Sequence, residues 1–335
     1  MTTIGDVAKH AGVSAMTVSR VLNNYGYVKE ETRERVDKAI AELGFVPNAL
    51  ARSLRFKRTN TLALILTDIT NPFFTTIARS VEDAASEKGF NVMFCNTDES
   101  QAKETEYLNV LLQKQVDGVL LVPATSNTES ISLLQERSVP VVVIDRRIPD
   151  MQVDTVRCDS ELGAYQLTKY LLDLGHRQIA ILGGTETVST SVDRITGYQR
   201  AFAEANLEYS QDMVRYGQFT SQSGYDVTQE LLNLERPPTA FVATNNFIAI
   251  GAYRALQEAG LQVPHDVSLV AFDDIPAALV FNPFLTVVGQ PAHEIGRQAT
   301  NLLLSRLNGG NTNPPQEIIL PLTMTIRQSS GPPKP

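Results

Sequence analysis

Hydroxyl, amide and guanidinium side chains share one short segment near the start of the chain, GVSAMTVSRVLNN (residues 12–24). Apolar side chains recur in it at the spacing of one helix face: Val18, Val21 and Leu22.

The other face carries groups that can hydrogen-bond to phosphate oxygens: Ser14, Thr17, Ser19 and Asn23. Arg20 can bind a guanine edge through two hydrogen bonds, and Ala15 and Met16 offer apolar contact to a thymine methyl group. The pattern predicts a face that enters the major groove of double-stranded DNA. The alternative is a solvated face on a small structural bundle.

The segments around this face have the pattern of a three-helix bundle. An apolar stripe precedes it, Ile4, Val7, Ala8 and Ala11, and another follows it, Val36, Ala39, Ile40 and Leu43. Gly12 and Val13 are expected to form a turn, and Ser14 is expected to cap a helix over residues 15–22. Two short helices joined by a glycine turn and packed on a third are typical of a helix-turn-helix.

The charge of the chain is divided unevenly. Residues 1–59 carry ten Lys and Arg against six Asp and Glu, whereas the whole chain has a net charge of −8. A basic segment on an acidic chain favours contact of that segment alone with a polyanion.

The segment after Pro47 allows two interpretations. NALARSLR (residues 48–55) is too short for a stable isolated helix, but it could form one when two copies pack together on DNA. Asn48, Leu54 and Arg55 would then contact DNA, with Leu54 as an apolar wedge in the minor groove. A plain linker is the other interpretation.

From residue 60 onward, apolar strands alternate with amphipathic helices in two successive sets, the second starting at TVRCD (residues 155–159). Such alternation predicts an α/β fold with parallel sheets covered by helices on both faces. The expected architecture is therefore an all-α headpiece followed by two doubly wound lobes. Ligands of such sheets lie outside the carboxyl ends of the strands.

Polar and aromatic side chains stand at those predicted strand ends. They are Asn71, Phe73, Phe74, Asp145, Arg146, Arg194, Phe219, Asn245, Asp273 and Gln290. Phenylalanine rings can stack on the apolar faces of a sugar ring while charged and amide groups bind its hydroxyls. Each position also has a structural alternative: Phe73 and Phe74 as core, Asp145 and Arg146 as an ion pair, and Arg194 as a surface charge.

The quoted segments, together with TRERVDKAIAELGFVPNALARSL, resemble the LacI/GalR family of bacterial transcription regulators over essentially the whole chain. The resemblance implies that Ala15, Met16 and Arg20 lead base readout and that Leu54 is a hinge wedge. The strand-end residues resemble the sugar-contacting set of ribose- and galactose-type binding proteins, which implies a monosaccharide effector, ribose first. Asn246 stands where relatives often have Asp.

The resemblance also implies a division of the chain and an assembly. We expect a headpiece (1–47), a hinge (48–59), an N-lobe (60–157 and 290–318) and a C-lobe (158–289 and 319–330). An operator with two half-sites requires two headpieces, and the proline-rich end QSSGPPKP has no heptads, so a homodimer is expected.

Other classes of function find little support in the sequence. No nucleotide-binding glycine motif, nucleophile elbow or metal-ligand spacing is present, so we expect no enzyme, no cofactor and no metal. No apolar run reaches the roughly 18 residues of a membrane span, and the first residues do not resemble a signal peptide, so a cytoplasmic protein is expected. Two alternatives remain: a regulator co-repressed by a purine or a phosphorylated partner protein, and a solute-binding protein of a sugar transporter.

Overall fold

The computed structural model describes residues 2–22, 25–46, 58–275, 283–309 and 314–334, which form two compact units, Met1–Thr59 and Asn60–Pro335. Four residues assigned to DNA contact lie outside the described ranges: Asn23, Asn48, Leu54 and Arg55.

The described residues of the first unit form the helices α1 (Ile4–Ala11), α2 (Ala15–Leu22) and α3 (Glu30–Leu43). Gly12 ends α1 with a φ of 65°, in the left-handed region that glycine adopts without strain. The predicted stripes form one core of Val7, Ala8, Ala11, Val18, Val21, Val36, Ala39 and Phe45. Ile4 is an exception to the prediction: its side chain is 38% exposed, because it lies in the first turn of α1, beside the Thr3 cap.

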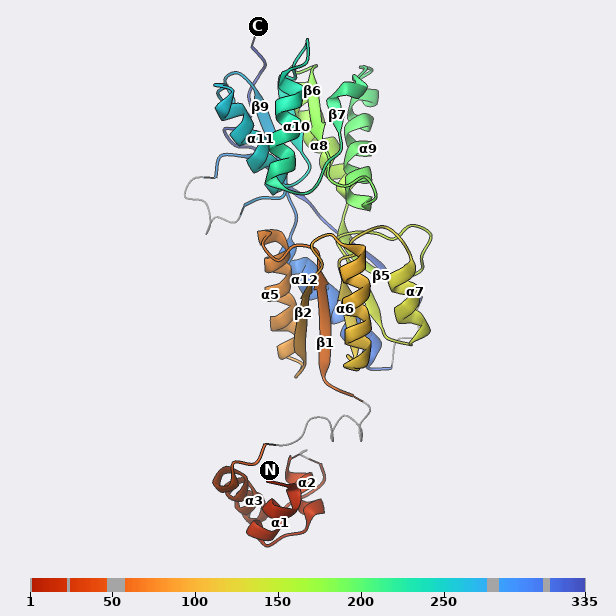
Figure 1. The fold of residues 1–335 in the computed structure, drawn as a ribbon, viewed down its shortest axis with the longest axis vertical. Helices are drawn as coiled ribbons and strands as arrows, with labels where there is room; N and C mark the ends of the chain where they lie inside the picture. The colour runs from red at the N-terminus through yellow and green to blue at the C-terminus, as the bar shows by residue number, and fades with distance from the viewer. Residues whose placement is uncertain (1, 23–24, 47–57, 276–282, 310–313, 335) are drawn as a thin grey trace. The chain divides into compact units, whose positions relative to one another are not determined.

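The second unit contains two six-stranded sheets (Figure 1). The first has the order β11-β5-β4-β3-β1-β2 and is parallel throughout. Its strands are β1 (Thr61–Leu66), β2 (Asn91–Asn96), β3 (Gly118–Leu121), β4 (Val141–Ile144), β5 (Asp154–Cys158) and β11 (Glu317–Leu320). Helices α5 (Pro72–Ser86) and α12 (Ala292–Leu307) pack on one face, and α6 (Gln101–Gln113) and α7 (Glu129–Glu136) on the other.

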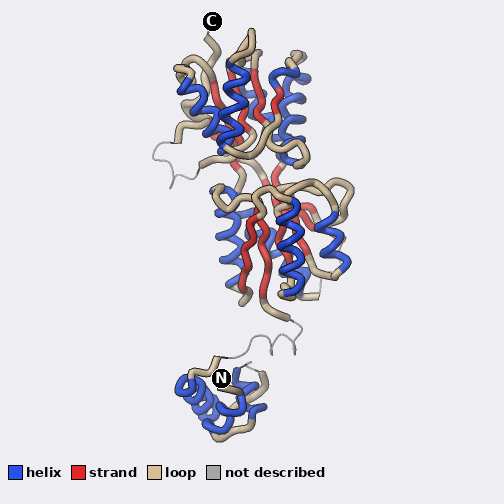
Figure 2. The backbone as a smooth tube through the Cα atoms, in the orientation of Figure 1, coloured by secondary structure: helices blue, strands red, loops and turns tan. Residues whose placement is uncertain are grey.

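The second sheet has the order β12-β10-β9-β8-β6-β7, in which only β12 is antiparallel to its neighbour. Its strands are β6 (Ile179–Leu182), β7 (Val214–Arg215), β8 (Ala240–Ala243), β9 (Ser268–Phe272), β10 (Thr286–Gly289) and β12 (Thr323–Thr325). Helices α8 (Ser160–Asp173) and α9 (Ser189–Glu204) cover one face, and α10 (Ser221–Leu232) and α11 (Asn246–Glu258) the other. A single 3₁₀ turn, η1 (Gln211–Met213), precedes β7. Figure 2 shows the strands of both lobes enclosed by helices.

The chain passes between the two lobes at three points, after β5, after β10 and after β11, since the next element in each case belongs to the other lobe. The strand rhythm placed β5 at the start of the second set, and this is wrong: Asp154–Cys158 pairs with β4 and β11 in the first sheet, the lobe to which the expected division at residue 157 assigned most of this strand. Its sequence rhythm is that of any buried strand and does not say which sheet it joins.

Within the described ranges, no helix is both long and apolar enough to span a membrane.

Candidate functional site

The recognition face of the first unit is the outer side of α2. Ala15, Met16 and Arg20 are exposed, with Met16 68% accessible, whereas Thr17 and Ser19 are half-buried. The Thr17 backbone N–H donates to Ser14 Oγ over 3.2 Å, and the two hydroxyls lie 3.0 Å apart. Ser14 therefore caps α2 as predicted, which fixes the angle at which the exposed face is presented.

Two tyrosines beside this face were not singled out from the sequence. Tyr25 and Tyr27 follow α2 and are 72% and 87% exposed, and the Tyr25 backbone N–H donates to the Arg20 carbonyl over 3.0 Å. The signal in the sequence was the aromatic pair in YGY, next to a predicted DNA-contacting helix.

A cavity of about 490 Å³ lies in the second unit and is lined by both lobes. Nine of the ten predicted ligand-binding residues line it: Asn71, Phe73, Phe74, Asp145, Arg146, Arg194, Phe219, Asn245 and Asp273. The tenth, Gln290, is not among its lining residues and instead donates from Nε2 to Asp273 Oδ1 over 2.9 Å. Gln290 lies in the segment that connects β10 of one lobe to α12 of the other, and its hydrogen bond holds Asp273 in the cavity wall.

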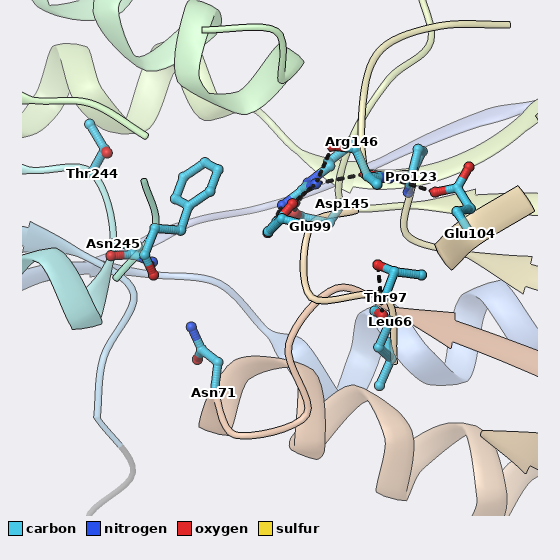
Figure 3. Close-up of polar contacts among 12 residues, drawn as sticks. Leu66, Asn71, Thr97, Glu99, Glu104, Pro123, Asp145, Arg146, Thr244 and Asn245 are labelled. Atoms are coloured by element: carbon cyan, nitrogen blue, oxygen red, sulfur yellow. Dashed lines mark hydrogen bonds and ion pairs between the residues drawn. The ribbon is translucent and has the colours of Figure 1, made fainter. Parts of the chain in front are cut away.

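Arg146 is held by a residue that the sequence analysis missed. Its two terminal nitrogens each donate to Glu99 over 2.6 Å, and Nη1 also donates to the Pro123 carbonyl over 2.6 Å (Figure 3). Its separation from Asp145 is 4.0 Å, so the pairing with its neighbour in the chain is the weaker one. Glu99 lies in the loop before α6 with a φ of 58°, a conformation that no periodic pattern reveals.

Another carboxylate near this pair, Glu104 of α6, is fully buried. It accepts from the Ala124 backbone N–H over 2.6 Å and from the Ser130 hydroxyl. Burial raises the pKa of Glu104. These bonds anchor the loop whose Pro123 carbonyl holds Arg146.

On the opposite wall, Arg194 and Asp273 are both buried. Arg194 donates from Nη1 to the Thr244 carbonyl over 2.5 Å, and its guanidinium carbon lies 3.8 Å from the centroid of the Phe272 ring. It lies in the second turn of α9, which begins at Ser189, rather than at the helix start as predicted, and its burial excludes the surface-charge alternative. Burial raises the pKa of Asp273 to about 6, and it also raises the pKa of Asp145.

Phenylalanine rings contribute the apolar part of the lining. Phe73 and Phe74 meet edge to face with centroids 5.1 Å apart, and both belong to the core of the first lobe as well as to the cavity wall. Phe219, in the loop after β7, lies 5.5 Å from the Arg146 guanidinium carbon of the other lobe. Core and cavity are therefore not exclusive alternatives for Phe73 and Phe74.

The asparagines at the cavity are engaged with the protein itself. Asn71 and Asn246 form a reciprocal amide pair between the lobes, with Nδ2 to Oδ1 distances of 3.1 and 3.0 Å. Asn245 caps α11, its Oδ1 accepting from the Ile248 backbone N–H over 2.7 Å. An asparagine at 246 can both donate to and accept from Asn71, whereas an aspartate could only accept.

A second bridge between the lobes is ionic. Arg147, after β4, donates to both carboxylate oxygens of Asp193 in α9 over 2.7 and 3.2 Å, and its backbone N–H donates to Ser189 Oγ over 3.0 Å. The Ser126 backbone N–H donates to the Thr187 carbonyl over 3.1 Å. Together with the Asn71–Asn246 pair, these contacts hold the lobes closed around the cavity.

Several buried polar atoms of residues in the cavity wall, or of Gln290 beside it, have no hydrogen-bond partner among the described residues. They are Asp145 Oδ1, Arg146 Nε, Arg194 Nε, Gln290 Oε1 and Thr67 Oγ1. Buried groups of this kind are costly unless something satisfies them. Acceptors and donors stand side by side here, which suits a ligand that carries several hydroxyls or amide-like groups.

Comparison with known proteins agrees with both parts of this description. Residues 3–48 match the family model for bacterial regulatory proteins of the lacI family, and residues 59–328 match that for periplasmic binding proteins and the sugar-binding domain of the LacI family. The chain belongs to the LacI family. It is thus a DNA-binding transcriptional regulator, with a helix-turn-helix followed by a domain of the periplasmic-binding-protein type.

Relatives within the LacI family include a repressor named PurR and solved structures with different bound molecules. The transcriptional repressor PurR of Vibrio campbellii is 39% identical over 308 residues, which is 92% of each chain. The structure of a LacI-family regulator from Enterococcus faecium with bound ribose is 33% identical, with a TM-score of 0.73 over 82% of this chain and 100% of that one. The lac repressor dimer bound to operator and the anti-inducer ONPF is 27% identical, with a TM-score of 0.87 over 98% and 99%.

Proposed function

We propose that this LacI-family regulator is a repressor that binds a palindromic operator as a homodimer and releases it when a monosaccharide, ribose first, occupies the cavity between the lobes. The observation that carries the effector assignment is the set of buried, unsatisfied polar atoms around an aromatic-lined cavity. Hydrogen bonds between hydroxyls and carboxylate or guanidinium groups contribute roughly 1.5–3 kcal/mol each, more than neutral hydrogen bonds do.

The DNA-binding residues proposed for α2 follow from its exposed face. Arg20 and Met16 read base edges together with Ala15, and Ser14, Thr17 and Ser19 position the helix on phosphates. The hinge at residues 48–59 and the lobe boundaries given above remain part of this proposal, as does a cytoplasmic location, on the nucleoid when the operator is bound.

A purine is the second candidate effector, because relatives named PurR are among the most similar proteins. A flat nucleobase could lie between the rings of Phe73 and Phe219, which line the cavity from different lobes. It would leave more of the hydrogen-bonding capacity of Asp145, Arg146 and Arg194 unused than a polyol would. Co-repression by a phosphorylated partner protein would not require these groups at all. A transporter component is disfavoured by the family match of residues 3–48.

A thermal-shift screen of the full-length protein with monosaccharides and nucleobases tests the effector. A specific ligand at about 100 times its Kd adds about 2.7 kcal/mol of stability. We expect stabilisation by a sugar, ribose first. A response to hypoxanthine or guanine with none to any sugar would overturn the assignment.

A further inference from the structure

We infer that Glu99 makes the cavity selective for uncharged ligands and excludes phosphorylated and carboxylated ones. The inference rests on the proposed function, because it concerns which small molecules the cavity accepts. It starts from the ion pair that Glu99 forms with Arg146 and from the position of both residues in the cavity wall.

The Glu99–Arg146 pair removes the cation that an anionic ligand would need. Both terminal nitrogens of Arg146 donate to Glu99, and the buried Nε, which lies 4.0 Å from Asp145, has no hydrogen-bond partner among the described residues. The Arg146 side chain is 4% exposed and that of Glu99 is 26% exposed. A phosphate or carboxylate that paired with both terminal nitrogens of Arg146 would have to displace Glu99, and one that accepted only from the second hydrogen of Nη2 would lie beside the Glu99 carboxylate, so in both cases the ligand would face a second anion.

The other charged side chains that line the cavity also disfavour an anionic ligand. Its described lining contains five carboxylates, Asp68, Asp98, Glu99, Asp145 and Asp273, against two guanidiniums, Arg146 and Arg194. Lys103 offsets one carboxylate, since it pairs with Asp98. Arg194 already donates to a backbone carbonyl and stacks on a phenylalanine ring. The cavity wall is therefore net negative at neutral pH even if one of the buried aspartates is protonated.

Helix N-termini at the cavity favour a bound anion, but each does so more weakly than a full charge. Helices α5, α9, α10 and α11 begin at the cavity, and contact of an anion with a helix N-terminus strengthens binding roughly two- to fivefold. The side-chain oxygens of Asn71 and Asn245 already accept from the first-turn amides of Phe73 and Ile248. These two amides are thus already engaged in capping, and each helix terminus acts on a bound anion less strongly than a full carboxylate charge does.

The first experiment compares neutral and anionic ligands on the wild-type chain. Two matched pairs are suitable: ribose with ribose 5-phosphate, and glucose with glucuronate, in which a carboxylate replaces a CH2OH group at nearly constant size. Isothermal titration at pH 7.5 should give at least tenfold weaker binding for the anionic member of any pair whose neutral member binds. Equal or tighter binding of the anion would overturn the inference and leave the proposed sugar effector in place.

The second experiment assigns the selectivity to Glu99. Glu99→Gln should bind the anionic member at least tenfold more tightly than the wild type does, while its affinity for the neutral member changes less than fivefold. Glu106→Gln, at an exposed position of α6, removes the same charge outside the cavity and should change neither affinity. Because Glu99→Gln leaves Arg146 without its ion-pair partner, Glu99→Gln with Arg146→Gln is a second variant with the net charge of the wild type.

The double variant should melt cooperatively and should not gain affinity for the anion. A folded Glu99→Gln variant with unchanged discrimination would show that Glu99 does not set the selectivity. If neither member of either pair, nor any other sugar, binds the wild type or the variants, the sugar assignment itself fails together with the inference.

Discussion

Asp145 and Asp273 occupy matching positions in the two lobes. Each follows a central strand of its sheet, β4 or β9, with a φ of 66°. The backbone N–H of Asp145 donates to the Val156 carbonyl and that of Asp273 to the Val288 carbonyl, both over 2.9 Å. The same local geometry thus delivers one buried carboxylate from each lobe to the cavity.

The raised pKa of Asp273 predicts a pH-dependent stability. Its folded pKa of about 6 lies above its ordinary value of 3.8, so its contribution to stability is complete below about pH 4 and is lost as pH rises through 6. Relative to Asp273→Asn, the unfolding free energy of the wild type should fall by up to about 3 kcal/mol between pH 4 and 7. Urea denaturation at several pH values measures this difference. A difference that stays constant with pH would contradict it.

Gly184 is predicted to fix the position of Phe219. A Cβ atom at residue 184 would lie 2.2 Å from the Phe219 ring, so Gly184→Ala must displace that ring from the cavity wall. We expect effector affinity, measured by isothermal titration, to fall at least tenfold, or about 1.4 kcal/mol. Gly289→Ala is the matched control, because its nearest neighbour, the Thr323 carbonyl, is 3.8 Å away. Unchanged affinity in Gly184→Ala would mean that Phe219 does not contact the effector.

The ion pair between Arg147 and Asp193 should favour the closed lobes and so strengthen effector binding. Because the Arg147 side chain is 40% exposed, we expect a coupling energy of only about 0.5–1 kcal/mol, a two- to fivefold change in Kd. A double-mutant cycle on the effector Kd with alanine at both positions measures it. The Arg254–Glu258 pair lies within α11 of one lobe and should show no coupling to effector binding. Equal coupling in both cycles would exclude a role in closure.

Arg20 is predicted to recognise a specific base edge rather than only to contact DNA phosphates. Arg20→Ala should weaken binding to an operator selected from random DNA by about 1–3 kcal/mol while leaving weak, salt-sensitive binding to any duplex. Lys88→Ala, an exposed charge on the second unit, should leave the preference for the operator intact. Equal losses on selected and random DNA in Arg20→Ala would make Arg20 a phosphate contact.

The sequence was sufficient to predict which residues lie close together at the cavity, because the carboxyl ends of parallel strands lie at the same edge of a sheet. Asp145, Arg194 and Asp273 were found in this way, and nine of the ten predicted residues line one cavity. Periodicity also predicted the three-helix core around Val18 and Val36.

Contacts between distant segments were beyond such reasoning. Glu99 lies in a loop with a positive φ, and its partner Arg146 is 47 residues away. The partner of Asn246 is 175 residues away, and Gln290 donates to the lining residue Asp273 without lining the cavity itself. These pairings depend on how loops of different elements meet, which no local pattern encodes.

The most direct test of the account is whether a ligand in the cavity changes the affinity of the protein for its operator DNA. Fluorescence anisotropy of the full-length protein on its selected operator should show at least tenfold weaker binding when the stabilising sugar is saturating. In Arg194→Gln, which loses a buried charge of the cavity wall, the same sugar concentration should leave operator affinity unchanged. Operator affinity that does not change in the wild type while the sugar is demonstrably bound would contradict the account.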